Sequence, residues 1–207
     1  MTTTKPFSAP CERNRDPILA VLRSVLQSPV RVLEIGSGTG QHAVHFGAHL
    51  PYLQWQTSDL AENHDGIRAW LSEAKLLNVL PPIHIDMADA EWSTPLVDSG
   101  FSVVYTANTC HIMSWPQVQS MVNGIARLLP PGGLLCIYGP FNYGGLPTSD
   151  GNAQFDATLR EAGSHRAIRD AEALQALVRA NGLHQHDDHA MPANNRLMIF
   201  QRFATGD

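Results

Sequence analysis

The stretch from Val30 to Gln41 limits the possible folds of this chain most strongly. It reads Val-Arg-Val-Leu-Glu-Ile-Gly-Ser-Gly-Thr-Gly-Gln. The apolar run predicts a buried strand, and the three glycines at alternate positions predict a tight turn after it. Because glycine has no side chain, a ligand can approach the backbone of such a turn closely. The stretch therefore predicts a strand followed by a ligand-binding loop.

The spacing of these glycines distinguishes between cofactors. Dinucleotide-binding folds place the third glycine three positions after the second, and here that position is Gln41, which disfavours a nicotinamide oxidoreductase. The pattern resembles instead motif I of the class I S-adenosylmethionine-dependent methyltransferases. The resemblance implies that the loop passes beneath the methionine and ribose parts of S-adenosylmethionine. It makes these residues the expected cofactor contacts: Glu34, Gly36, Ser37, Gly38, Thr39 and Gly40.

Two aspartates extend the predicted cofactor site. Asp59 lies nineteen residues beyond Gly40 and follows a predicted strand from Leu53 to Thr57. A carboxylate at such a strand end can accept hydrogen bonds from both ribose hydroxyls, although an acidic helix cap is the alternative. Asp86 falls in a predicted strand from Ile83 to Met87. The resemblance implies that Asp86 binds the adenine amine and that Met87 lies against the ring, while an ordinary loop aspartate is the alternative.

Composition limits the partners that we expect. The 207 residues, 43% of them hydrophobic, predict a single domain over 1–207, with 1–29 forming an N-terminal arm and a helix. No apolar run reaches the roughly 20 residues of a membrane helix, and the first residues lack the apolar core of a secretion signal. A net charge of −5 without a basic run gives no support to nucleic-acid binding. The expected partner is a small molecule, and the sequence does not reveal the oligomeric state.

The cysteines and histidines predict neither disulfides nor a metal site. The three cysteines, Cys11, Cys110 and Cys136, are widely separated, which indicates reduced thiols in the cytoplasm and excludes zinc-binding pairs. His184 and His186 lie two residues apart on a predicted strand, but two imidazoles do not make a metal site. We interpret this segment as a solvated edge strand.

Helical and strand periodicities alternate along the rest of the chain and predict an α/β fold. Asp16 followed by Pro17 predicts the start of a helix that ends near Ser28. The other predicted elements are a helix from Ile67 to Leu77 stopped by Asn78 and Pro81-Pro82, a strand from Phe101 to Ala107, a helix from Ser114 to Leu129, a strand from Leu134 to Tyr138, a loop from Gly139 to Asn152, a helix from Ala171 to Ala180 capped by Asp170, and a hairpin of strands from Leu183 to His189 and from Arg196 to Phe203.

The loop after the strand from Phe101 to Ala107 is the predicted catalytic segment, because ligands of open α/β sheets bind beyond the carboxyl ends of the strands. Asn108 is expected to position the acceptor and to contact the cofactor, and no pair of prolines follows it as in nucleic-acid amino methyltransferases. His111 is the predicted general base, since imidazole titrates near neutrality; a structural loop histidine is the alternative. Cys110 is interpreted as a core residue.

Further motifs resemble a methyltransferase-like family that includes methyltransferase-like protein 26. They include Arg13-Asn14, Trp55-Gln56, Arg68-Ala69-Trp70, Tyr138-Gly139-Pro140 and Met191 to Asn195. The resemblance implies a three-layer Rossmann-like fold with a seven-stranded, mostly parallel sheet of order 3-2-1-4-5-7-6 and an antiparallel strand seven. It adds Arg13, Asn14, Asn194 and Asn195 to the candidate pocket, with structural roles as the alternative. Tyr143, in the long loop, is a further candidate substrate contact.

The leading hypothesis from the sequence is methyl transfer from S-adenosylmethionine to a small-molecule acceptor. The alternative is a non-catalytic regulatory or partner subunit that binds S-adenosylmethionine or S-adenosylhomocysteine. Neither the motifs nor the resemblance implies which molecule accepts the methyl group.

Overall fold

A computed structural model describes residues 5–204, which divide into two compact units. The first unit comprises residues 5–86 and Gly100–Thr106, and the second comprises Met87–Ser99 and residues 107–204. The organisation of the chain as a single domain therefore stays a prediction. None of the described helices is long and apolar enough to cross a membrane.

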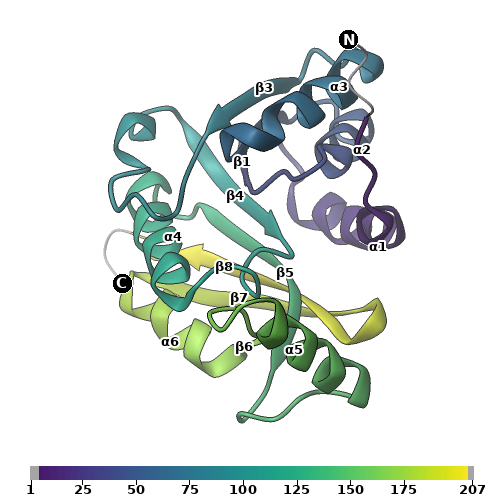
Figure 1. Cartoon of the computed structure of the whole chain (residues 1–207). Coiled ribbons are helices and arrows are strands. Elements are labelled where there is room, and N and C mark those ends of the chain that lie inside the picture. The colour runs from purple at the N-terminus through teal and green to yellow at the C-terminus, as the bar shows by residue number, and fades with distance from the viewer. Residues whose placement is uncertain (1–4, 205–207) are drawn as a thin grey trace. The chain divides into compact units, whose positions relative to one another are not determined.

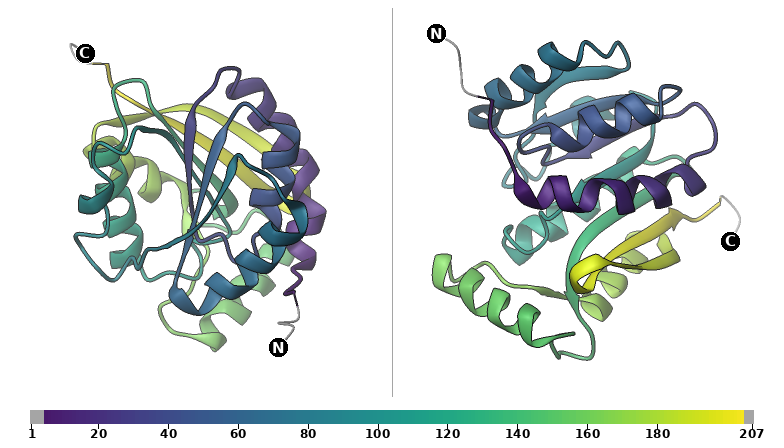
Figure 2. Two further views of the ribbon diagram at one scale, coloured as in Figure 1. Left: turned by 90° about the horizontal axis from the view of Figure 1, so that it is seen from above. Right: turned by 90° about the vertical axis from the view of Figure 1, so that its right-hand side faces the viewer.

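Four parallel strands form the sheet of the first unit, in the order β3-β2-β1-β4. Their bounds are Arg31–Ile35 for β1, Gln54–Asp59 for β2, Val79–His84 for β3 and Phe101–Ala107 for β4. Helices α1 (Ala9–Val25), α2 (Gln41–His49) and α3 (His64–Ala74) lie side by side on one face of this sheet, as Figures 1 and 2 show. The large side chains between them are fully buried: Ile18, Leu22, Phe46, Trp55 and Tyr105.

The start of α1 differs from the prediction. The helix begins at Ala9, and the Ser8 hydroxyl accepts a hydrogen bond from the backbone N–H of Cys11. Pro17 lies inside the helix rather than at its first position. The longer helix places Asn14 and Ile18, four residues apart, on the same buried face, and this packing outweighs the local signal of Asp16 and Pro17. The first four residues of the predicted arm lie outside the described residues.

The predicted bounds of strand β3 and helix α3 are also wrong. The Pro81-Pro82 pair lies within β3 instead of preceding it, and β3 ends at His84, before Asp86 and Met87. Proline is tolerated there because β3 is an edge strand of the sheet. Helix α3 ends at Ala74, followed by Lys75 in the left-handed conformation. Leu77, predicted to belong to this helix, is 97% exposed.

The second unit contains β5 (Leu134–Asn142), β8 (Asn195–Arg202) and β7 (Leu183–Met191), which are adjacent and antiparallel in that order. The two-residue strand β6 (Arg169–Asp170) pairs with the end of β5. The predicted loop from Gly139 is shorter than expected, because β5 continues to Asn142 and Pro140 is paired with Asn195. Asp170 caps α6 (Ala171–Ala180), as predicted, whereas Ser114, predicted as the first residue of its helix, is the cap of α4 (Trp115–Leu128). Helix α5 (Asp150–Ala162) lies between β5 and β6 in the sequence.

The strand order β3-β2-β1-β4-β5-β8-β7 confirms the predicted Rossmann-like α/β fold. Residues 5–204 form eight strands rather than seven, because the short β6 precedes the final hairpin. The last strand is antiparallel to its neighbours, as predicted. Short 3-10 helices connect some of these elements: Ala61–Asn63, Thr94–Leu96 and Pro192–Asn194.

Replacing Gly124 with alanine is expected to destabilise the second unit. A Cβ atom at Gly124 would lie 2.4 Å from the ring of Trp92, whose indole N–H is bound to the Ser120 carbonyl. Overpacking of this kind costs about 1 to 3 kcal/mol. Urea unfolding measures the change, with Gly151→Ala as the control, since the nearest neighbour of a Cβ there is 3.8 Å away. Equal stability of the two variants would contradict the packing argument.

Candidate active site

The glycine loop between β1 and α2 has the backbone that its sequence predicts. Gly36, Gly38 and Gly40 have φ angles of 70°, 57° and 87°, which non-glycine residues rarely adopt. A Cβ atom at Gly38 would meet nothing within 4 Å, whereas one at Gly40 would lie 3.2 Å from the backbone of Ile67 on α3. The loop therefore borders open space at Gly38 and packs closely against α3 at Gly40.

Asp59, the last residue of β2, binds this loop directly. Its Oδ2 accepts a hydrogen bond of 2.7 Å from the Gly38 N–H. Its Oδ1 accepts from the Leu60 N–H at 2.7 Å and from Asn63 Nδ2 at 2.8 Å. A carboxylate offers about four acceptor positions, so one position remains, on Oδ2. Asp59 thus lies beside the loop and also caps the turn that follows; ribose binding stays a prediction.

Glu34 lies beneath the loop and fastens it to β2. Its Oε2 accepts from the Ser37 hydroxyl at 2.9 Å and from the Trp55 indole N–H at 3.0 Å. The Ser37 hydroxyl accepts in turn from the Ser58 N–H. Burial raises the pKa of Glu34 to about 7. The hydrogen bonds from Trp55 and Ser37 lower this pKa, and the negative charge of Asp59 raises it by a smaller amount than burial does. Glu34 and Ser37 are buried, so their direct role in the structure is to hold the loop.

Gln41 joins the start of α1 to the loop, a role that the sequence analysis missed. Its Oε1 accepts from the Ser8 N–H and, at 3.0 Å, from the Thr39 hydroxyl. Its Nε2 donates to Glu12 at 3.2 Å. The contacts of Gln41 with Ser8 and Glu12 join residues about thirty positions apart. The local sequence indicates only that Ser8 can cap a helix, not that Gln41 binds there.

The two pocket candidates on α1 have different surroundings. The Asn14 carbonyl oxygen is 2.7 Å from His42 Nε2, and both side chains are buried. Burial lowers the pKa of His42 to about 4, so this pair is a neutral buried contact. Arg13 lies within α1 rather than ahead of it, and it is exposed. Asn14 therefore has a structural role in this unit, and contact of either residue with a ligand stays a prediction.

The loop after β4 supplies the predicted catalytic residues in the second unit. Asn108 has a φ of 59°, and its N–H donates to the Tyr138 carbonyl at 2.9 Å. Such backbone conformations are frequent at functional sites, and asparagine tolerates them. The His111 ring is 6% exposed and lies 5.3 Å from the Phe155 ring, centroid to centroid. Asn108 and His111 are therefore held in fixed positions in this loop.

Arg169, which the sequence analysis did not single out, holds this loop in place. Its guanidinium donates to the carbonyls of Cys110, at 2.9 Å, and of Met113. Cys110 is buried, as predicted, and burial raises the pKa of its thiol to about 11. The thiol is therefore protonated at neutral pH and unsuited to act as a nucleophile.

His111 is expected to stay neutral throughout the physiological pH range. Burial first, and then the charges of Arg169 and Arg166, lower the pKa of His111 to about 4. A neutral imidazole can accept a proton without first losing one. NMR titration, with the His111 signals assigned by comparison with His111→Gln, should show no inflection between about pH 5.5 and pH 9. An inflection near pH 6.5 would contradict the burial argument.

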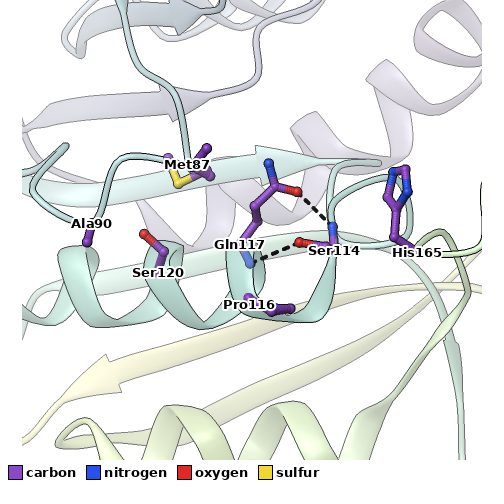
Figure 3. A pocket seen from close by; sticks show the side chains of 8 residues that line it. Met87, Ala90, Ser114, Pro116, Gln117, Ser120 and His165 are labelled. Carbon is purple, nitrogen blue, oxygen red and sulfur yellow. Dashed lines mark hydrogen bonds between the residues drawn. The ribbon is translucent and has the colours of Figure 1, made fainter.

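Met87 lines a pocket of about 650 Å³ in the second unit. Figure 3 shows Met87 and Ala90 facing the first turns of α4, with His165 at the far end. Ser114 and Gln117 cap the helix reciprocally, the backbone N–H of each bonding to the other's side chain. Gln117 and Ser120 add polar groups to this lining. Contact of Met87 with an adenine ring stays a prediction, and so does the role of Asp86, which belongs to the first unit.

A second pocket, of about 440 Å³, brings together three predicted substrate residues, Tyr143, Asn194 and Asn195. We call it the hairpin pocket, because it lies where the hairpin of β7 and β8 turns; its lining also includes Thr148, Met191 and Arg196. The Tyr143 hydroxyl donates to Asp188 at 3.1 Å, and burial followed by the Asp188 charge raises the pKa of Tyr143 to about 12.

No group of three or more His, Cys, Asp or Glu side chains within residues 5–204 could hold a metal ion. Asp188, on the strand β7 that also carries His184 and His186, pairs with Arg196 at 2.8 Å.

A family comparison covers nearly the whole chain. Residues 5–202 match the model of a family described as "Protein of unknown function (DUF938)". The chain belongs to this family. The description of the family states no activity, so membership does not decide between the functional hypotheses.

Solved structures show how widely the fold of this family member is shared. An O-methyltransferase family protein from Burkholderia thailandensis matches with a TM-score of 0.80 and 20% identity, over 93% of this chain and 57% of that chain. The S-adenosylmethionine-dependent methyltransferase SibL matches with a TM-score of 0.76 and 19% identity, over 93% and 55%. An O-methyltransferase family 2 protein from Planctomyces limnophilus DSM 3776, in complex with apigenin, matches with a TM-score of 0.76 and 16% identity, over 91% and 56%.

These likenesses confirm the class I methyltransferase fold. The chain spans about half the length of the proteins that it matches. At identities of 20% or less, the comparison establishes the fold and leaves the activity to be argued from the residues.

Proposed function

We propose that this protein transfers a methyl group from S-adenosylmethionine to a small-molecule acceptor. The observation that carries the proposal is the contact between the Asp59 carboxylate and the Gly38 N–H, beside a loop position that is open to a ligand. The Asp59 carboxylate has one acceptor position left, and the backbone at Gly38 carries no side chain. This combination suits a ligand that carries ribose hydroxyls. The fold shared with S-adenosylmethionine-dependent methyltransferases supports the same cofactor.

The glycine loop, Asp59, Asp86 and Met87 are the residues that we assign to cofactor binding. When bound, S-adenosylmethionine supplies a methyl group that its sulfonium already activates. The protein therefore has to bind, orient and exclude water, and well-oriented proximity alone supplies about 7 to 11 kcal/mol of barrier lowering. Since Asp59 has one acceptor position left, a second ribose contact requires the loss of one of its bonds within the chain.

Residues of the second unit are assigned to the acceptor. We assign His111 to accept the proton of the nucleophile and Asn108 to position that nucleophile. The pKa of about 4 makes His111 a weaker base than the free imidazole on which the sequence prediction rested. The side-chain oxygen of Asn142, at the end of β5, is buried and has no hydrogen-bond partner among the described residues. A buried acceptor without a partner suits a donor group on a bound molecule. The small-molecule acceptor is also supported by the neighbour in complex with apigenin.

Two measurements test this proposal. Calorimetry should show binding of S-adenosylmethionine in preference to NADH, and labelled-methyl transfer into a cell extract should label a compound of low molecular mass. A Gly38→Val variant, which fills the open position, is the control that should lose both signals. Preference for NADH would contradict the cofactor assignment. Tight binding without transfer to any compound would favour the non-catalytic subunit instead.

We also infer membership of the methyltransferase-like family that includes methyltransferase-like protein 26, and a cytoplasmic location. The motifs quoted for that family support the first inference. The second is supported by Cys11, Cys110 and Cys136, which are all free thiols.

A further inference from the structure

We propose that the hairpin pocket binds a carboxylate group of the acceptor through Arg196. This inference rests on the proposed function, because it identifies the chemical class of the molecule that receives the methyl group. Tyr143, Asn194 and Asn195 were expected from the sequence, whereas Arg196 was not. Arg196 lines the same pocket and supplies its positive charge.

Asp188 holds one edge of the Arg196 guanidinium and leaves the other edge available. The Nε atom of Arg196 donates to Asp188 Oδ1 at 2.8 Å, and its Nη2 donates to the Asp188 backbone carbonyl at 3.1 Å. Arginine has five N–H groups, and the two bonds to Asp188 use the Nε donor and one Nη2 donor, while the Tyr143 hydroxyl lies close enough to interact with the guanidinium as well. Asp188 does not use the edge formed by Nη1 and Nη2, which carries two parallel N–H groups.

The surroundings keep the guanidinium in this orientation. The other Asp188 oxygen, Oδ2, accepts from the Tyr143 hydroxyl at 3.1 Å, and the Tyr143 ring lies 5.8 Å from the guanidinium carbon of Arg196. The side chain of Arg196 is 27% exposed and that of Asp188 is 16% exposed. The side chains of Arg196 and Asp188 are both partly buried, and each takes part in two hydrogen bonds. Little of their rotamer entropy therefore remains to be lost when a ligand binds.

The rest of the pocket suits a small carboxylate. A planar carboxylate matches the free edge of a guanidinium with two parallel hydrogen bonds. Thr148, Asn194 and Asn195 are polar and uncharged, so Arg196 is the one charged residue in the lining, and its partner Asp188 lies outside the lining. Tyr143 and Met191 provide aromatic and apolar surface for a carbon skeleton.

The test compares 4-fluorobenzoate with 4-fluorobenzamide by fluorine NMR titration of the full chain. The two probes differ in charge and not in the shape of the ring. We expect the wild-type protein to bind the benzoate roughly tenfold more tightly or better. Arg196→Gln should bring benzoate affinity down to that of the amide. Arg196→Lys keeps a charge near Asp188 and loses the planar fork, so it should recover only part of the difference.

Arg179→Gln is the matched control, because Arg179 is an exposed arginine on α6 in the same unit and its loss should leave benzoate affinity unchanged. Equal affinity of the wild-type protein for the two probes would overturn the proposal. So would unchanged benzoate affinity in Arg196→Gln. If thermal melting shows that Arg196→Gln does not fold, the wild-type comparison and Arg196→Lys decide the question.

The same samples show whether the carboxylate site or the methyltransferase assignment is wrong, because each can fail without the other. Benzoate binding through Arg196 without calorimetric binding of S-adenosylmethionine would sustain the carboxylate site and contradict the methyltransferase assignment. Methyl labelling of a compound that has no carboxylate would sustain the methyltransferase and overturn the carboxylate site.

Discussion

Replacing Asp59 with alanine is expected to lower the affinity for S-adenosylmethionine roughly 100-fold or more. A hydrogen bond to a charged group contributes about 1.5 to 3 kcal/mol, and each 1.4 kcal/mol is about tenfold in affinity. The variant loses the proposed ribose contact together with the bond that holds the Gly38 N–H at 2.7 Å. The cofactor therefore loses its polar anchor and also the fixed conformation of the loop.

Calorimetry with S-adenosylmethionine measures this effect, and circular dichroism checks that the variant folds. Asp65→Ala is the matched control, because Asp65 is an exposed carboxylate in the first turn of α3 that pairs with Arg68 on the same helix. We expect the control to bind as the wild-type protein does. If a folded Asp59→Ala protein retains wild-type affinity, the ribose assignment is wrong. Asp59→Asn retains one acceptor oxygen, so its affinity for S-adenosylmethionine should lie between that of the wild-type protein and that of Asp59→Ala.

Glu34 is expected to make the protein less stable as the pH rises through neutrality. Burial raises its pKa from an ordinary value of 4.5 to about 7, so the folded protein holds a proton that the unfolded chain has released. The contribution of Glu34 to the free energy of unfolding is therefore fully present below about pH 4.5 and declines up to about pH 7. At 1.36 kcal/mol per pKa unit, the decline amounts to about 3 kcal/mol.

Glu34→Gln removes this titration and keeps an oxygen that can accept from Ser37 and Trp55. Urea unfolding of both proteins at about pH 4.5, 6 and 8 should show the difference between them changing in favour of the variant as the pH rises. Other titrating groups, such as His42, contribute equally to both proteins and cancel in the difference. Glu62→Gln, at an exposed carboxylate, should follow the wild-type curve. Parallel curves for Glu34→Gln and the wild-type protein would refute the argument.

Local signals in the sequence predicted much of the fold. The β-branched and aromatic run from Phe101 to Ala107 gave the bounds of β4, and the helical periodicity from Ser114 to Leu129 gave those of α4 to within one residue at each end. The glycine loop and Asp59 were predicted together, and the structure places them in contact. These predictions succeeded because each depends on residues that are neighbours in the sequence or on a recurrent strand-loop-helix motif.

Predictions failed where tertiary packing outweighs a local signal. Pro17 and the Pro81-Pro82 pair were interpreted as boundaries, yet Pro17 lies inside a helix that has one buried face, and the pair lies in an edge strand. The bond between Tyr143 and Asp188 spans 45 positions, and no local pattern indicates it. The sequence therefore indicated the glycine loop well and the lining of the hairpin pocket only in part.

The contacts of Gln41 make the glycine loop and the beginning of α1 a single cooperative segment. Its amide binds Ser8 and Glu12 on one side and Thr39 on the other. A ligand that stabilises the loop must therefore also slow the local opening of α1, since the two share these bonds. Amide hydrogen exchange at the start of α1 would then report on an event at the loop, although residues 8–12 lie about thirty positions away in the sequence.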